Sequence, residues 1–150
     1  EAAFTTDIAF ERQNRVPLQL KKKEVFEAGV DLAKLLGVII YFDSGKADIR
    51  PDAASELQKI INVLQENPAL KIDVRSHTDS RASARYNLSL SERRVQSTIK
   101  YIVEQGGIEK FRVTGRGYGE SQLLNECKDR VKCSDEKHQL NRRSEFIVVE

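Results

Sequence analysis

The succession of strand-like and helix-like patterns limits the folds open to this chain more than any other feature. Val38–Phe42 is a continuous apolar run of the length typical of a strand buried in a sheet. A helical pattern opens at Pro51, ends at Asn67-Pro68 and has one apolar stripe, formed by Leu57, Ile60, Ile61 and Leu64. Residues 71–75 then alternate polar and apolar, as in a strand with one packed face. Because a helix between two strands is the usual crossover between parallel neighbours, the pattern predicts an α/β fold.

The second half of the chain continues this alternation. We expect a helix to begin near Leu88, where Ser89 and Glu92 have capping-box spacing and Ser91 is a competing cap, and to end at Gly106-Gly107. Residues 111–114 and 145–149 read as a third and a fourth strand, and a glycine-rich turn is expected after the third. The predicted order is β-α-β-α-β, a loop, then β. The sheet should be mixed and mostly parallel, with the last strand in either direction.

The first 37 residues show weaker patterns than the rest. Residues 7–10 and 18–20 suit short strands, and a helix is expected after Gly29. We therefore predict a lead-in or linker over residues 1–37, or the tail of a preceding domain, and one folded domain over residues 38–150. Since the first residue is Glu1, we expect the chain to be a processed or excised part of a longer protein.

Composition narrows the classes of partner. The 25 basic and 23 acidic residues nearly cancel, so the charge does not indicate nucleic-acid binding. Cys127 and Cys133 lie in a polar loop without the companion ligands that a zinc site requires. A disulfide is the favoured interpretation and would indicate an oxidising compartment, whereas two unpaired surface thiols are the alternative.

Charged residues follow the ends of predicted strands. Asp79 comes at the end of the second predicted strand, and we expect Arg94 one turn into the helix that follows. Ligands of α/β sheets usually bind beyond the carboxyl ends of parallel strands, so both residues should face one crevice. A carboxylate and a guanidinium there suit a zwitterion that has an ammonium and a carboxylate. The alternatives are an Asp that caps a turn and an Arg on a helix surface.

Four motifs occur in a characteristic order after Tyr41-Phe42-Asp43: His77-Thr78-Asp79, Asn87-x-x-Leu90-Ser91-x-x-Arg94, Gly117-Tyr118-Gly119-Glu120-Ser121 and Asn141-Arg142-Arg143. Together they resemble the OmpA-like peptidoglycan-binding domains of Gram-negative envelopes, over roughly residues 38–149. The resemblance implies a two-layer α/β sandwich with helices on one face of the sheet. Ala82 departs from it, because relatives often have glycine there. If the position needs a positive φ, alanine costs stability.

The resemblance also implies a function, namely non-catalytic binding of peptidoglycan through the diaminopimelate of its stem peptide. Such a domain would be periplasmic and would anchor an outer-membrane protein to the cell wall, without a cofactor or metal. Asp79 would hold the ammonium and Arg94 the carboxylate. The other expected ligand residues are Phe42, Asp43, Ser44, Thr78, Asn87 and, from the Asn-Arg-Arg element, Arg143, although the sequence does not decide between Arg142 and Arg143.

Two other functions are possible. A protein-interaction or structural domain of the same fold would have lost the peptidoglycan ligand, and Ala82 and the Asp43-Ser44-Gly45 loop motivate that alternative. A hydrolase is disfavoured because Ser76 and His77 are consecutive in a strand and point to opposite faces, so they cannot form a nucleophile–base pair. The sequence does not indicate an oligomeric state.

Overall fold

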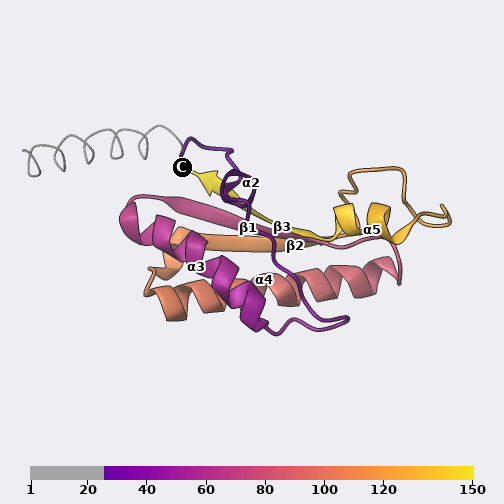
Figure 1. The fold of residues 1–150 in the computed structure, drawn as a ribbon, viewed down its shortest axis with the longest axis horizontal. Helices are drawn as coiled ribbons and strands as arrows, with labels where there is room; N and C mark the ends of the chain where they lie inside the picture. The colour runs from indigo at the N-terminus through magenta and orange to yellow at the C-terminus, as the bar shows by residue number, and fades with distance from the viewer. Residues whose placement is uncertain (1–25) are drawn as a thin grey trace, which may run out of the picture.

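The computed structural model describes residues 26–150, in which a three-stranded sheet packs against two long helices (Figure 1). The strands are β1 (Lys71–His77), β2 (Val113–Gly119) and β3 (Arg143–Val149). The sheet order is β2-β1-β3, with β1 parallel to β2 and antiparallel to β3. The predicted α/β class with a mixed sheet is confirmed, and parallel pairing is confined to β1 and β2.

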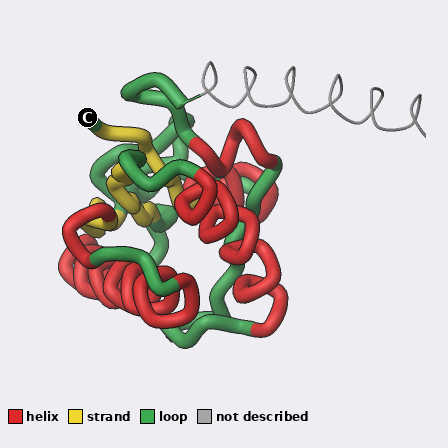
Figure 2. Tube along the Cα trace, turned by 90° about the vertical axis from the view of Figure 1, so that its left-hand side faces the viewer, coloured by secondary structure: helices red, strands yellow, loops and turns green. Residues whose placement is uncertain are grey.

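Helices α3 (Pro51–Glu66) and α4 (Ala84–Gly106) lie on the same side of the sheet (Figures 1 and 2). The predicted stripe of α3 is fully buried, and it meets the sheet side chains Ile72, Val74, Phe146 and Val148 in one core. Burial of these apolar side chains is the main stabilising contribution to the fold. Three short helical elements complete the structure: α2 (Leu32–Leu36), the 3₁₀ turn η1 (Lys110–Arg112) and α5 (Asp135–Asn141). None of the helices in residues 26–150 is both long and apolar enough to cross a membrane.

The strand predicted at Val38–Phe42 is wrong. The segment is extended, with Val38 and Ile40 buried and Ile39 and Tyr41 exposed, but it belongs to no strand. The outer edge of β3 is instead occupied by residues 29–31: the Gly29 amide donates to the Val148 carbonyl at 2.8 Å, and the Val148 amide donates to the Val30 carbonyl at 2.8 Å. A run of apolar residues indicates that side chains are buried, but it does not show that the backbone pairs with a neighbouring strand.

Helix α4 begins at Ala84, four residues before the predicted start. Ser83 is its N-cap and accepts a hydrogen bond from the Tyr86 amide at 3.1 Å. Two of the residues that suggested a cap bind β2 instead: Glu92 Oε2 accepts from the Gly117 amide at 2.8 Å, and Ser91 Oγ accepts from the Gly119 amide at 2.9 Å. Arg94 consequently lies about three turns into α4, not one. The predicted end is confirmed, since Gly107 caps the helix with φ +62°.

The glycines expected in a turn belong to strand β2, and they let α4 approach the sheet closely. A Cβ at Gly115 would lie 2.7 Å from Val95 Cγ1, and one at Gly117 would lie 2.3 Å from the Glu92 amide nitrogen. Any side chain there would force the helix away. The turn prediction is wrong because glycine in a strand can mark close backbone approach as well as a bend.

The helix expected after Gly29 is α2, which Asp31 caps by accepting from the Ala33 amide at 3.0 Å. Leu32 of this helix is fully buried in the core. The short strands predicted at residues 7–10 and 18–20 lie outside the described residues, and the division of the chain at residue 37 remains a prediction.

Candidate functional site

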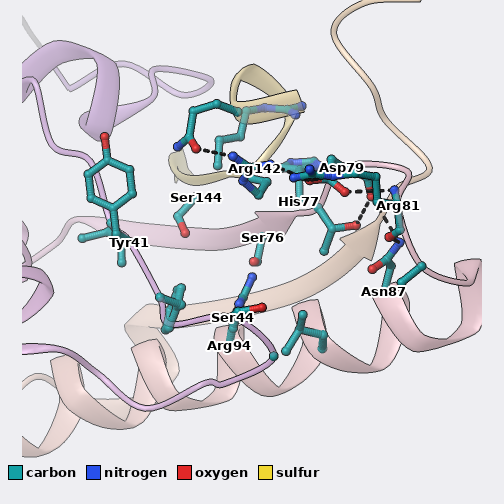
Figure 3. A pocket seen from close by; sticks show the side chains of 18 of the residues that line it. Tyr41, Ser44, Ser76, His77, Asp79, Arg81, Asn87, Arg94, Arg142 and Ser144 are labelled. Atoms are coloured by element: carbon teal, nitrogen blue, oxygen red, sulfur yellow. Dashed lines mark hydrogen bonds and ion pairs between the residues drawn. The ribbon is translucent and has the colours of Figure 1, made fainter. Parts of the chain in front are cut away.

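A cavity of about 570 Å³ opens where β1 ends (Figure 3). Its walls come from four parts of the chain: the extended segment at residues 40–45, the loop after β1, the first three turns of α4, and the junction of α5 with β3. The structure brings seven predicted ligand residues to this cavity: Phe42, Ser44, Thr78, Asp79, Asn87, Arg94 and Arg143. Asp43 does not line the cavity: its exposed carboxylate lies 3.5 Å from Arg50, and its carbonyl accepts from Arg94 Nη2 at 3.2 Å.

Asp79 is almost fully buried and is already paired with two cations. Arg142 Nη1 donates to Asp79 Oδ2 at 2.6 Å, and Arg81 Nη2 donates to the same oxygen at 2.9 Å. The Arg81 amide adds a bond to Oδ1 at 2.9 Å. Burial by itself raises the pKa of Asp79, but the hydrogen bonds from Arg81 and Arg142 outweigh it and hold the pKa below its usual value. The carboxylate therefore stays ionised at neutral pH.

Arg94 differs from the other arginines of the cavity. Its Nε donates to the Lys46 carbonyl at 2.9 Å and its Nη2 to the Asp43 carbonyl at 3.2 Å, while the guanidinium lies over the Phe42 ring at 4.8 Å. Burial lowers its pKa, but an arginine remains charged at any physiological pH. The other cavity arginines all have carboxylate partners within 4 Å: Arg50, Arg81, Arg142 and Arg143. Among the described residues, Arg94 has no such partner.

Asn87 and Thr78 hold the loop that carries Asp79. Asn87 Nδ2 contacts the carbonyls of Asp79 and Arg81 at 3.1 and 2.9 Å, and also Glu120 Oε1 at 3.0 Å. The Thr78 amide donates to the Gly119 carbonyl at 2.8 Å. The loop contains Ala82 at φ +71°, the strained conformation anticipated from the sequence. Both predicted residues thus act on the loop in this structure.

The predicted disulfide between Cys127 and Cys133 is present and supports the same loop from outside. The Ser80 hydroxyl donates to the carbonyl of Cys127, which is itself fully buried. Asn141 of α5 accepts from the Leu124 amide at 2.7 Å and donates to Asn125. These bonds attach the residues just before the disulfide to α5. The cavity wall at Asp79 is therefore linked to the disulfide.

His77 lies at the edge of the cavity but is engaged in the fold. Its Nε2 lies 2.8 Å from Glu145 Oε1, and its ring stacks on Tyr118 with centroids 5.3 Å apart. Burial lowers the pKa of His77, and the hydrogen bond to Glu145 only partly offsets this effect. The imidazole is neutral at pH 7.

Sequence reasoning missed the two arginines that neutralise Asp79. Arg142 and Arg143 both belong to the Asn-Arg-Arg element, and the sequence does not decide which of them faces the ligand. In the structure Arg143 pairs with Glu145 at 3.3 Å and donates to the Gln122 carbonyl at 3.0 Å, while Arg142 contacts Asp79. The position of α5 decides which arginine contacts Asp79, and no local sequence pattern predicts that position.

The sequence model of the OmpA family matches residues 41–136. This chain belongs to the OmpA family. The OmpA-family chain is 35% identical over 148 residues to photosystem I P700 chlorophyll a apoprotein A2 of Gloeobacter violaceus, covering 98% of this chain and 16% of that protein. It is 32% identical over 118 residues to the peptidoglycan-associated lipoprotein of Agrobacterium fabrum, covering 79% and 63%.

The fold is also similar to solved structures. The cell wall anchor of the T6SS from Pseudomonas aeruginosa aligns with a TM-score of 0.60 and 26% identity, covering 73% of this OmpA-family chain and 75% of that structure. The chain covers less than two thirds of the length of the two curated relatives named above. The activities of those whole proteins are therefore not attributed to it.

Proposed function

We propose that this chain is a non-catalytic periplasmic domain that binds peptidoglycan through the diaminopimelate of a stem peptide. In the full protein it would anchor an outer-membrane component to the cell wall. The observation that carries the proposal is Arg94, a nearly buried cation that lines a cavity and lacks a carboxylate partner among the described residues. A buried charge without a counterion is costly, so the site favours a ligand that supplies one.

The opposite wall suits the other end of a zwitterion. Asp79 remains ionised, and its two oxygens can accept from an ammonium as well as from Arg81 and Arg142. Those two guanidinium groups in turn favour further carboxylates on the ligand. A stem peptide that contains diaminopimelate offers both kinds of group.

The remaining predicted residues have supporting roles in this proposal. Asn87 and Thr78 hold the Asp79 loop in place, and Phe42 and Ser44 form the wall beside Arg94. Arg143 lies at the rim of the cavity. The names of relatives agree with this function, since they include a peptidoglycan-associated lipoprotein and a cell wall anchor.

Calorimetric titration with a diaminopimelate stem peptide and with its lysine counterpart tests the proposal. The wild type should bind the first and not the second, because lysine lacks the carboxylate that pairs with Arg94. Asp79→Ala and Arg94→Ala should each abolish measurable binding. Exposed Arg93 is the matched control, and Arg93→Ala should bind like the wild type. Unchanged affinity in either site variant would refute the mechanism.

A protein-interaction domain without a wall ligand is the second candidate. It is favoured by the pairing of Asp79 with Arg81 and Arg142, which already satisfies the carboxylate. Co-sedimentation with purified sacculi separates the two candidates. A folded protein that stays in the supernatant would support this alternative and count against peptidoglycan binding.

A further inference from the structure

Two serines face the same cavity from neighbouring strands. Ser76 of β1 and Ser144 of β3 are directly opposite each other in the antiparallel register, and both line the cavity. They continue the faces of Val74 and Phe146, which are buried in the core. At this end of the sheet the side chains on the core face therefore change from apolar ones to serine hydroxyls.

Neither serine hydroxyl has a hydrogen-bond partner among residues 26–150. Ser76 is 4% exposed and Ser144 is half-buried, and both line the cavity. A hydroxyl can donate one hydrogen bond and accept two, so both serines are available to a ligand in the cavity. Figure 3 shows the Ser76 hydroxyl pointing toward the guanidinium end of Arg94, with Ser144 beside it on the next strand.

Part of the donor capacity of Arg94 is used within the fold. Its Nε and Nη2 each donate one hydrogen bond, to the carbonyls of Lys46 and Asp43, so two of the five N–H groups of the guanidinium hold the loop. Of the three guanidinium nitrogens of Arg94, Nη1 is the one without a hydrogen-bond partner among the described residues. The remaining N–H groups of Arg94 can hold a ligand carboxylate, and the carboxylate lone pairs that they do not use are open to other donors.

We propose that Ser76 and Ser144 supply those donors and complete a carboxylate subsite with Arg94 Nη1. The inference rests on the proposed function, because it takes Arg94 as the partner of the ligand carboxylate. The two serines are then specificity-determining residues. They increase the affinity for a ligand that has a carboxylate at this position, whereas a ligand without one leaves both hydroxyls and Arg94 Nη1 unpaired.

The test is titration of Ser76→Ala, Ser144→Ala and the double variant with the diaminopimelate stem peptide. Each single variant should bind about tenfold more weakly, as expected when a hydrogen bond to a charged group is lost. Ser144→Thr keeps the hydroxyl and should retain the affinity. Ser55→Ala is the control, since Ser55 is exposed on α3 and bonds only to the Pro51 carbonyl.

Urea unfolding of the same variants distinguishes a binding role from a structural one. Because neither hydroxyl has a hydrogen-bond partner among the described residues, both alanine variants should be about as stable as the wild type while they bind more weakly. A double variant that binds within twofold of a binding-competent wild type would overturn the inference, and the proposed function would stand. If the wild type itself does not bind, the proposed function fails and the inference fails with it.

Discussion

Arg142 Nη1 lies 2.6 Å from Asp79 Oδ2, although the two residues are 63 positions apart. The contact joins the residue before β3 to the residues that follow β1, at the mouth of the cavity. It fixes both the charge of Asp79 and the direction in which its carboxylate points. Arg81 shares the carboxylate but is more exposed, so Arg142 provides the more buried of the two pairs.

Arg142→Ala should raise the pKa of Asp79, because one of the cations that keeps it ionised is lost. A lowered carboxyl pKa contributes stability that is present above the unfolded value, about 4, and is lost as the pH falls through the folded value. The variant should therefore be about 1 kcal/mol less stable at pH 7, with the difference vanishing in acid. NMR titration of the Asp79 carboxyl and urea unfolding measure both effects. Arg143→Ala is the control and should leave the pKa of Asp79 unchanged.

His77 should make the protein less stable in mild acid. Its pKa is lowered in the fold, so the unfolded chain binds a proton first as the pH falls below about 6.5. Stability should then decrease by up to about 1.4 kcal/mol per pH unit until the folded imidazole also titrates. His77→Gln should flatten this dependence between pH 7 and 5. An equally steep profile in the variant would show that another group is responsible.

Ala82→Gly should stabilise the protein by about 0.5–1 kcal/mol, since alanine at φ +71° is strained and glycine is not. Thermal unfolding measures the gain. Ala84→Gly is a matched control within the first turn of α4, where glycine should lower stability instead. A loss of stability in Ala82→Gly would mean that the loop is not held at this φ in solution.

Reduction of the Cys127–Cys133 disulfide should destabilise the protein by about 2 kcal/mol on loop-entropy grounds. It should also loosen the Asp79 loop, because Ser80 bonds to the carbonyl of Cys127. Amide hydrogen exchange should thus increase at residues 79–82 and remain unchanged in α3. Ligand affinity should fall in the Cys127→Ser/Cys133→Ser variant. Equal exchange in the oxidised and reduced proteins would contradict this coupling.

Gly117→Ala should destabilise the protein by about 2–3 kcal/mol, because its Cβ would overlap the backbone of α4 at Glu92. Gly107→Ala offers the comparison. It has open space around it and only the cost of φ +62°, about 1 kcal/mol. Urea midpoints of the two variants should differ accordingly. Equal losses would show that the packing of α4 on β2 can relax.

Local patterns predicted much of the fold. The spacing of apolar residues and the positions of proline, glycine and asparagine predicted helix α3, the end of α4 and strands β1 and β3. The number and spacing of the cysteines predicted the disulfide. The failures share one physical origin. Val38 and Ile40 are buried without ladder partners, Ser91 and Glu92 accept from amides of β2 instead of capping a helix, and the glycines of β2 mark close packing. In each case the role of the residue depends on a contact with a neighbour that is distant in the sequence.

The sequence by itself determined that the residues after β1 and those at the start of α4 meet at one cavity, because a strand end and the following helix lie at one edge of an α/β sheet. Only the tertiary structure decided how their charges are paired. Asp79 acquires Arg81 and Arg142, whereas Arg94 is left with backbone carbonyls and two serine hydroxyls nearby. Periodicity reports burial and local conformation, but the partner of a charged group depends on packing between segments far apart in the chain.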